Sequence, residues 1–270
     1  MTQDERRKYI IDLLKIDGQV RVSQLSRDLN TSEVTIRNDL AELEKDALLE
    51  RVHGGAVQTL KNYYALGYSE RLEQRKLEKI QMARLAADLV RDGDSLIINS
   101  GSTNYYFVQE LKQKKKNLKV ITNSLQIAED LSGVAGFKTV LLGGMISYQY
   151  LFTYGDDAIQ QLNRYQVDKT VLSLDGVHLE NGLTTYHHEV AELCRLMLQK
   201  ASTRIALADH TKIGHTAFAR IAKPSEIDIL VSDRKANTKF LKGLQKQEVH
   251  VIAPGIDLIE QPADGKVGSA

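Results

Sequence analysis

The residues best suited to chemistry follow a short apolar run, "SLIIN", in the first half of the chain. They are small and polar, and a stretch that favours a helix comes directly after them. Backbone N–H groups at the start of a helix bind anions, typically phosphate. A purely structural turn would also favour glycine and serine here. The pattern predicts an anion site made by Ser100, Gly101, Ser102, Thr103 and Asn104.

Several other apolar runs end in polar residues in the same way. Ligands of open α/β sheets bind at the carboxyl ends of the strands, so residues that follow different strands gather there. An aspartate accepts hydrogen bonds from sugar hydroxyls, and a lysine contacts phosphate or pairs with that aspartate. These strand ends predict a polar cup for a hydroxylated, phosphorylated molecule, made by Thr122, Asn123, Ser124, Gly143, Gly144, Asp175, Asp209 and Lys212.

Carboxylates near such a cup could also act as bases, which leaves a phosphosugar isomerase as an alternative function. Enolisation needs a carboxylate at the carbon acid and a group that stabilises the developing oxyanion. The candidate carboxylates are Asp175, Glu189 and Asp209. His188 and Glu192 stand one helical turn apart, but no third metal ligand accompanies them in the sequence. We therefore predict no metal, no cofactor and no catalytic residue.

A second set of candidate residues lies near the N-terminus, in "TSEVTIRNDLAELEKDALLERVHGGAV". Ser32 caps a predicted helix that runs to about Asp46, and its buried stripe is Ile36, Leu40 and Leu43. The opposite face is slim and polar, as a helix that enters the major groove of DNA must be. A tight turn with two glycines follows between short strands, and it suits a wing against the DNA backbone.

From these faces we predict that the unit binds DNA. Arg37 and Asn38 carry the hydrogen-bond donors that read base edges, and Val34 can contact a thymine methyl group. The same faces would also fit a unit that only binds protein or only dimerises the chain. The predicted DNA-binding residues are Ser32, Val34, Thr35, Arg37, Asn38, Arg51, His53 and Gly54.

The elements that must position these residues differ between the two parts of the chain. Residues 4–16 and 23–30 show the apolar spacing of helices, with Ser23 as the expected cap of the second. Further along, short apolar runs alternate with helical stretches, which favours a mostly parallel sheet covered on both faces. The runs are "DSLIIN", "LKVIT", "KTVLLGG", "KTVLSLDG", "RIALAD" and "DILVSD".

This change of pattern divides the chain into four predicted segments. Residues 1–57 form a DNA-binding winged helix–turn–helix, and residues 58–74 form a linker. Residues 75–260 form a larger α/β domain that senses a phosphosugar, and residues 261–270 form a disordered tail.

Composition sets limits on partners and location. The 270 residues carry a net charge of +1, and 42% of them are hydrophobic, as in a soluble globular protein. Residues 1–57 hold nine Lys or Arg against 11 Asp or Glu, so DNA binding must depend on where the charges lie. Cys194 is the single cysteine and is expected to be a small core residue. The sequence shows neither a membrane span nor a signal peptide, so we expect a cytoplasmic protein with no membrane partner.

The N-terminal motifs resemble the winged helix–turn–helix of the DeoR family of bacterial transcription regulators. The resemblance rests on "S-x-x-T-I-R-x-D-L", from Ser32 to Leu40, and on "R-V-H-G-G-A", from Arg51 to Ala56. Many members have a second arginine after Arg37, where this chain has Asn38, so the resemblance does not predict the operator bases. The family binds DNA as an oligomer, which implies a homo-oligomer, either a dimer or a tetramer.

Residues 75–235 resemble the DeoR-family sensor domain, through "SGSTN", "TNS", "LGGM", "DGV" with "NGLTT" and a glutamate, "ADHTK" and "DILVSD". That domain is similar in turn to ribose-5-phosphate isomerase. The resemblance implies that the loop at residues 100–104 holds phosphate, that Asp175, Asp209 and Lys212 face the sugar, and that Glu189 belongs to the same site. Asn99 stands where many members have aspartate and is assigned no role. The Lys-Gly-Gly-Gly stretch of the isomerases is missing after Asp175, which argues against catalysis.

Together these observations predict a DNA-binding transcription regulator, specifically a repressor of sugar or sugar-alcohol catabolic genes. Its expected partners are double-stranded operator DNA and a phosphorylated sugar or sugar alcohol as effector. The competing classes are an isomerase with an appended module and a protein-interaction scaffold.

Overall fold

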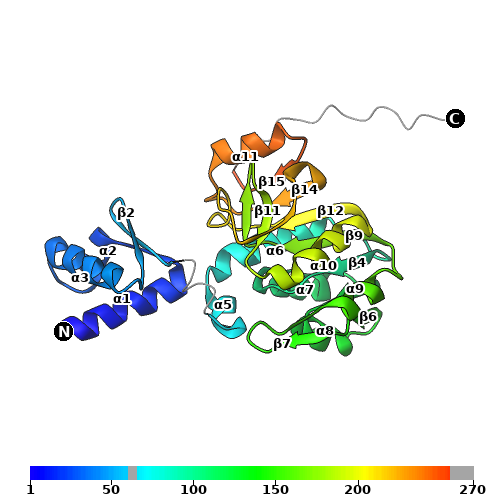
Figure 1. Ribbon diagram of the computed structural model, residues 1–270, viewed down its shortest axis with the longest axis horizontal. Coiled ribbons are helices and arrows are strands. Elements are labelled where there is room, and N and C mark those ends of the chain that lie inside the picture. The colour runs from blue at the N-terminus through cyan, green and yellow to red at the C-terminus, as the bar shows by residue number, and fades with distance from the viewer. Residues whose placement is uncertain (60–65, 256–270) are drawn as a thin grey trace.

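The protein consists of a small N-terminal unit beside a larger α/β unit, as Figure 1 shows. A computed structural model describes residues 1–59 and 66–255, so residues 60–65 of the predicted linker and the predicted tail lie outside the described residues. We call residues 1–59 the head. Its helices are α1 (Gln3–Asp17), α2 (Val22–Asp28) and α3 (Glu33–Lys45). Its antiparallel sheet has the order β1-β3-β2, with β1 (Gln19–Arg21), β2 (Glu50–Val52) and β3 (Gly55–Val57).

Local signals in the sequence explain where α1 and α3 begin and end. Thr2 and Glu5 form a capping box at the start of α1, and Gly18, at φ +72°, ends it in the left-handed conformation. Ser32 caps α3 by accepting a hydrogen bond from the Thr35 backbone N–H at 3.1 Å. The predicted stripe of α3 is buried in the core of the head, which confirms that helix, its cap and its inner face: Ile36, Leu40 and Leu43.

The second helix begins earlier than its sequence predicts. Arg21 is the N-cap of α2 and makes no side-chain capping bond, so the expected cap at Ser23 is wrong. The reason is a tertiary contact, because the Val22 N–H donates to the Gly54 carbonyl of the wing at 2.9 Å. That hydrogen bond and the pairing of β1 with β3 decide where the chain turns into the helix.

The larger unit is built on a parallel sheet of seven strands within residues 66–255, in the order β15-β14-β12-β9-β4-β5-β6. Six of the strands are the predicted apolar runs, and every neighbouring pair is parallel, so the predicted α/β fold is confirmed. The short edge strand β15 was not predicted. The strands are β4 (Ser95–Ile98), β5 (Leu118–Thr122), β6 (Phe137–Leu141), β9 (Val167–Ser173), β12 (Ala201–Leu207), β14 (Ile229–Val231) and β15 (His250–Ile252).

Helices cover both faces of this sheet, as predicted. One face packs against α6 (Lys76–Asp88), α7 (Ser102–Lys114) and α8 (Leu125–Ser132). The other packs against α9 (Asp156–Leu162), α10 (His188–Gln199) and α11 (Thr238–Gln245). In β4, Leu96 and Ile98 belong to the first core and Ile97 to the second, which is the alternation expected of a strand buried on both sides.

Short antiparallel pieces and one short helix complete the fold. The hairpin pieces are β7 (Met145–Ser147) with β8 (Phe152–Tyr154), and β10 (Gly176–His178) with β11 (Gly182–Thr185) and β13 (Ala219–Ala222). A 3-10 turn, η1 (Pro224–Glu226), precedes β14. Helix α5 (Tyr68–Glu73) lies between the head and the sheet, where Figure 1 shows it below α6.

Candidate functional site

The outer face of α3 presents the predicted DNA-reading side chains to solvent. Val34 is 63% exposed, and Arg37 and Asn38 are also exposed. Arg51, His53 and Gly54 are exposed at the wing, Ser32 is exposed, and Thr35 is half-buried. The structure therefore places all the predicted DNA-binding residues on the surface of α3, its cap or the wing. Their contact with DNA remains a prediction.

The wing is held against the rest of the head by its glycines and by Glu44. Gly54 has φ +78°, which suits glycine in the tight turn. A Cβ on Gly55 would collide with the Val20 carbonyl, so only glycine allows β3 to lie this close to β1. The Arg51 N–H donates to Glu44 Oε1 at 2.9 Å. These contacts fix the wing relative to α3.

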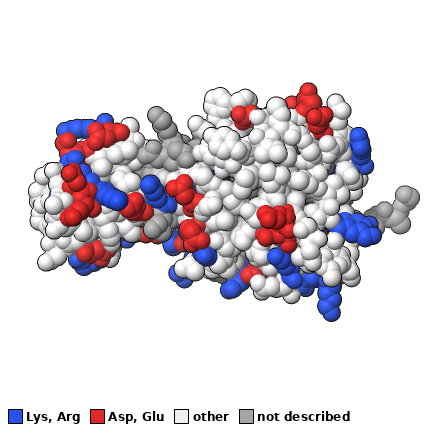
Figure 2. Space-filling model, turned by 90° about the horizontal axis from the view of Figure 1, so that it is seen from below, with Lys and Arg blue, Asp and Glu red and all other residues white. Residues whose placement is uncertain are grey.

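Charges on the head are mixed in sign, as Figure 2 shows. Arg37 Nη2 lies 2.5 Å from Glu33 Oε2, one helical turn earlier, and both side chains are largely exposed. The arginine predicted to read bases is therefore paired with a carboxylate in the absence of DNA. A local basic face, rather than an overall basic head, must provide the attraction to DNA.

Asp39 has a role that the sequence reasoning did not assign. It is 1% exposed, and its carboxylate accepts hydrogen bonds from Arg6 Nε at 2.5 Å and Arg6 Nη2 at 3.2 Å. Arg7 Nε lies 3.7 Å away. This aspartate of the "R-x-D-L" motif therefore ties α3 to α1. In the sequence, the only indication of this ion pairing was the presence of two arginines directly after Glu5.

A second cluster of predicted residues surrounds a small pocket at the carboxyl ends of β4, β5 and β9. The cavity holds about 40 Å³. Five of the predicted effector-binding residues line it together: Ser100, Gly101, Ser102, Asn123 and Asp175. These residues come from three strand ends, as the sequence predicts for a parallel sheet.

Backbone geometry brings the loop at residues 100–102 against β9. A Cβ on Gly101 would lie 2.7 Å from Ser173 Cβ, so the loop can approach the strand this closely only with glycine at that position. The Ser100 N–H donates to Asn123 Oδ1 at 2.9 Å. Asn99, to which no role was assigned, exchanges hydrogen bonds with the Ser173 main chain at 2.8 and 3.1 Å. The start of α7 is thereby held at the rim of the pocket.

Asp175 is the buried carboxylate of the pocket. Arg71 Nη2 lies 3.5 Å from its Oδ1, while Thr185 Oγ1 and the Tyr186 N–H each donate to its Oδ2 at 3.0 Å. Burial raises the pKa of Asp175. Arg71, Lys212 and the Tyr186 N–H together lower it by more than burial raises it, so the pKa lies below its ordinary value. The group is a stable carboxylate at neutral pH.

The lining also contains side chains that were not among the predicted effector-binding residues, including Tyr68, Arg71, Tyr150 and His187. Tyr68 and Arg71 belong to the predicted linker, now α5. The Arg71 guanidinium lies 5.5 Å from the centre of the Tyr150 ring. Burial lowers the pKa of His187 by more than the Asp175 carboxylate raises it, and Arg71 lowers it further, so this imidazole is neutral at pH 7.

The other predicted effector residues lie outside the lining of this pocket. Several of them serve the backbone: the Asn104 amide donates to the carbonyls of residues 99 and 171, and Ser124 caps α8. Thr122 Oγ1 accepts from the Ser124 N–H, and the Gly143 N–H donates to Gln161. Thr103 is buried in α7, Gly144 lies against the Tyr154 carbonyl, and Glu189 is exposed on α10. Their predicted contact with an effector stays a prediction.

Asp209 and Lys212 follow the carboxyl end of β12, on the side of the sheet that faces the head. Asp209 Oδ2 is 3.3 Å from Arg75 Nε, and both residues are buried. Burial raises the pKa of Asp209, but Arg75 and Lys212 lower it well below its ordinary range. Lys212 also lowers the pKa of Asp175, so its charge acts on both carboxylates.

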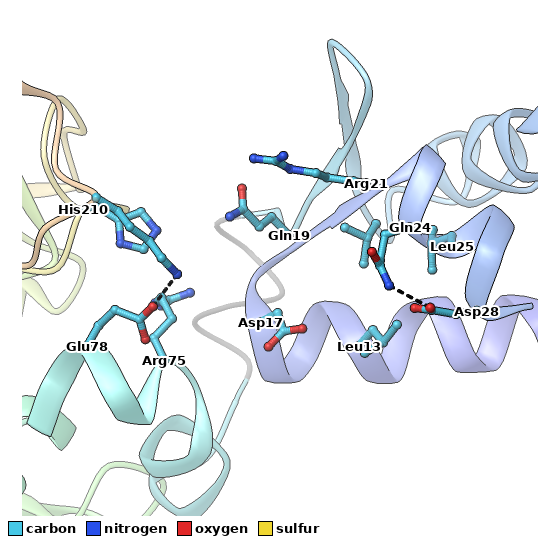
Figure 3. Close-up of a pocket in the computed structure, with 12 residues that line it drawn as sticks. Leu13, Asp17, Gln19, Arg21, Gln24, Leu25, Asp28, Arg75, Glu78 and His210 are labelled. Atoms are coloured by element: carbon cyan, nitrogen blue, oxygen red, sulfur yellow. Dashed lines mark hydrogen bonds and ion pairs between the residues drawn. The ribbon is translucent and has the colours of Figure 1, made fainter.

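A larger cleft of about 480 Å³ lies between the head and the larger unit. Figure 3 shows Arg75 and Glu78 on one side of it, facing Asp17 and Gln19 of the head. The cleft is open, and surface side chains of two units line much of it. The small pocket is the better candidate site, because buried polar groups from several strands converge there.

Two further sequence expectations concern cysteine and membranes. Cys194 lines the pocket and is 2% exposed, and burial raises its pKa to about 12, so it is a core thiol as expected. Within residues 1–59 and 66–255, no three His, Cys, Asp or Glu side chains are grouped to hold a metal ion. In the same part of the chain, every helix is too short or too polar to cross a membrane.

Comparison with known proteins assigns the family. A model described as the DeoR C terminal sensor domain matches residues 74–234, which is more than half of the chain. The chain belongs to the DeoR family. A model of the DeoR-like helix-turn-helix domain matches residues 6–61, the part that contains α3 and the wing. This DeoR-family protein is therefore a DNA-binding transcription regulator with a C-terminal sensor domain.

Its relatives are named as transcriptional regulators, and the sequence similarity extends along nearly their whole length. The transcriptional repressor GlcR of Bacillus subtilis is 36% identical over 252 residues, which cover 93% of this chain and 96% of that protein. A lactose phosphotransferase system repressor of Lactococcus lactis is 30% identical over 246 residues, which cover 90% and 95%. Among solved structures, a ribose 5-phosphate isomerase of Methanocaldococcus jannaschii matches 50% of this DeoR-family chain and 52% of its own at 19% identity, with a TM-score of 0.37.

Proposed function

We propose that this DeoR-family protein is a repressor whose operator binding is controlled by a phosphorylated sugar or sugar alcohol. One observation carries the proposal: the loop predicted to hold phosphate and the buried carboxylate predicted to face the sugar line the same pocket. The two ends of a phosphosugar need these two environments at the same time. The relative named as a lactose phosphotransferase system repressor supports a carbohydrate-related effector.

The phosphate end is assigned to the loop at residues 100–102. This loop leads into α7, a helix of 13 residues whose first backbone N–H groups carry partial positive charge. Arg71 lines the same pocket and adds a full positive charge. An anion held there would contact both.

The sugar end is assigned to Asp175 and its neighbours. A carboxylate accepts two hydroxyl hydrogen bonds, and the depressed pKa of Asp175 keeps it ionised. Among the described residues, the buried Tyr68 hydroxyl has no hydrogen-bond partner, although Tyr68 lines the pocket. A sugar hydroxyl would supply that partner. The low pKa also makes Asp175 a poor base, which favours binding over isomerisation.

The direct test is fluorescence anisotropy of the full-length protein on DNA from upstream of its gene cluster, with a panel of sugar phosphates and sugar-alcohol phosphates. The expected result is submicromolar binding that one compound changes by about 5- to 150-fold. DNA binding without any response would overturn the effector assignment. Turnover of an aldose phosphate would instead support the isomerase.

Gly101→Ala is expected to remove the effector response while sparing DNA binding. The new methyl group would collide with Ser173 and displace the loop from the phosphate position. Loss of charge-assisted hydrogen bonds predicts an effector affinity lower by about tenfold or more. Calorimetric titration measures the affinity, and Gly133→Ala is the matched control because the space around Gly133 is empty. Equal effector affinity in both variants would exclude this loop as the phosphate site.

Glu33→Gln is expected to strengthen operator binding. The change releases Arg37 from its 2.5 Å ion pair and removes a negative charge near the phosphates. A surface pair is weak, so we expect a gain of about two- to fivefold. Anisotropy titrations at several salt concentrations measure it, with Glu110→Gln on the sensor helix α7 as the control. Weaker binding by Glu33→Gln would mean that the pair orients Arg37 for the DNA.

A further inference from the structure

Helix α5 contacts the effector pocket at one end and adjoins the head at the other. Tyr68 and Arg71 line the pocket. Gln74 and Arg75 follow directly after the helix, and both reach the end of α1. One turn of chain therefore separates the pocket wall from the residues that hold the head.

The pocket must enlarge before a phosphosugar can enter. Its volume of about 40 Å³ compares with roughly 300–1,000 Å³ for small-molecule sites in proteins. Asn99 and Ser173 cannot give way easily, since they are hydrogen-bonded to each other across adjacent parallel strands. Arg71 lies on a six-residue helix, and the Tyr68 N–H at its start binds the Gln149 carbonyl of the neighbouring loop. Helix α5, together with that loop, is the wall that can move.

On the other side, Gln74 contacts the head. Its side chain is fully buried, and its amide donates to the Lys15 carbonyl near the end of α1. The same amide donates to Gln58 Oε1 at 2.9 Å, just beyond β3. Displacing Gln74 would therefore remove hydrogen bonds from two places at the base of the head.

Arg75 sets the geometry of this junction. It adopts a left-handed conformation, with φ +48°, which is uncommon for a residue other than glycine. Its guanidinium pairs with Asp209 and lies so close to Gly18 that a Cβ there would collide with it. The strained backbone is held by contacts with the head on one side and the sheet end on the other.

Charge connects the pocket to the junction. Around Asp175 and Asp209 stand four basic side chains: Arg71, Arg75, Lys79 and Lys212. Lys79, 1% exposed, donates to the Arg71 carbonyl and so links α5 to α6. These basic side chains favour an anionic ligand at this end of the sheet. A phosphate arriving here competes directly with Asp175 for Arg71.

We propose that residues 68–75 form a latch that couples the effector pocket to the head. The proposal rests on the function proposed above. The anionic effector takes Arg71 from Asp175, the sugar hydroxyls replace Arg71 on that carboxylate, and α5 moves away from the pocket. Gln74 then leaves the Lys15 carbonyl, and the head is freed from its docked position.

The test is pulsed electron paramagnetic resonance between spin labels at Asp12→Cys on α1 and Arg84→Cys on α6, both exposed positions. Buried Cys194 stays in place because it is inaccessible to the labelling reagent. Labelled full-length protein is diluted with unlabelled protein and measured with and without saturating inorganic phosphate. The expected result is a narrow distance distribution that phosphate shifts and broadens.

Gln74→Ala separates the latch from the pocket. It removes the head contacts and leaves the lining intact, so phosphate should still stabilise the variant, at least as strongly as it stabilises the wild type. The distance distribution should be broad from the start, and an effector response of about tenfold in operator affinity should fall below about twofold. Gln81→Ala, a half-buried glutamine on α6, is the matched control and should behave as the wild type.

Failure of the latch and failure of the phosphate site give different results. Phosphate that stabilises the wild type without changing the distance distribution overturns the latch. Phosphate that gives no stabilisation counts against the phosphate site instead, and the ligand-free proteins then decide the question. In them, Asp175→Asn releases Arg71 and Gln74→Ala releases the head, so both must broaden the distribution. A narrow distribution in either variant overturns the latch.

Discussion

Arg37→Ala is expected to abolish specific operator binding while the sensor domain continues to bind its effector. Arg37 lies exposed on α3, and its side chain is the longest one on that face that carries hydrogen-bond donors. A base-reading arginine is worth about 1–3 kcal/mol. The predicted homo-oligomer would place two heads on one operator and double the loss, so affinity should fall by roughly 30-fold to more than 10,000-fold. Anisotropy on operator DNA measures the effect.

The control for Arg37→Ala is Arg84→Ala, which removes the same charge from an exposed site on α6. It should leave operator affinity nearly unchanged. Hydrogen exchange of α1 and α3 should be the same in Arg37→Ala and the wild type, because Arg37 contributes only a surface ion pair to stability. Operator binding within about threefold of the wild type would show that α3 does not read the DNA through Arg37.

Asp39→Ala should also abolish DNA binding, but by unfolding the head. The substitution leaves Arg6, whose side chain is 11% exposed, without its carboxylate partner. Removing one member of a buried ion pair costs about 3–5 kcal/mol. This cost falls on a head with a small core of its own, between α1, α3 and the wing. Hydrogen exchange should show lost protection in α1 and α3, while the sensor sheet keeps its protection.

The control for Asp39→Ala is Asp12→Ala, which removes an exposed carboxylate from α1 and should preserve both protection and DNA binding. If Asp39→Ala kept a protected head and still failed to bind DNA, Asp39 would be a DNA-contacting residue and not a structural one. The Arg37 and Asp39 variants thus separate the reading of DNA from the integrity of the reader.

The local elements could be predicted because their causes are local. Ser32 caps α3 by accepting a hydrogen bond from an N–H only three residues further along the chain. The buried residues of that helix recur every three to four positions. The apolar runs became strands because each is short, contains β-branched residues and is followed by turn residues. Their alternation with helices determined a parallel sheet, and its strand ends brought Ser100, Asn123 and Asp175 together.

The tertiary structure alone decided which charged residues pair. Arg71 and Asp175 are 104 positions apart, Arg75 and Asp209 are 134 apart, and Arg6 and Asp39 are 33 apart. No periodicity links such residues, because an ion pair needs only proximity in space and either partner has many alternatives along the chain. For the same reason the segment expected to be a linker became the wall of the pocket. Its polar composition indicated solvent, whereas burial against the sheet end made its Arg71 a partner of the buried Asp175.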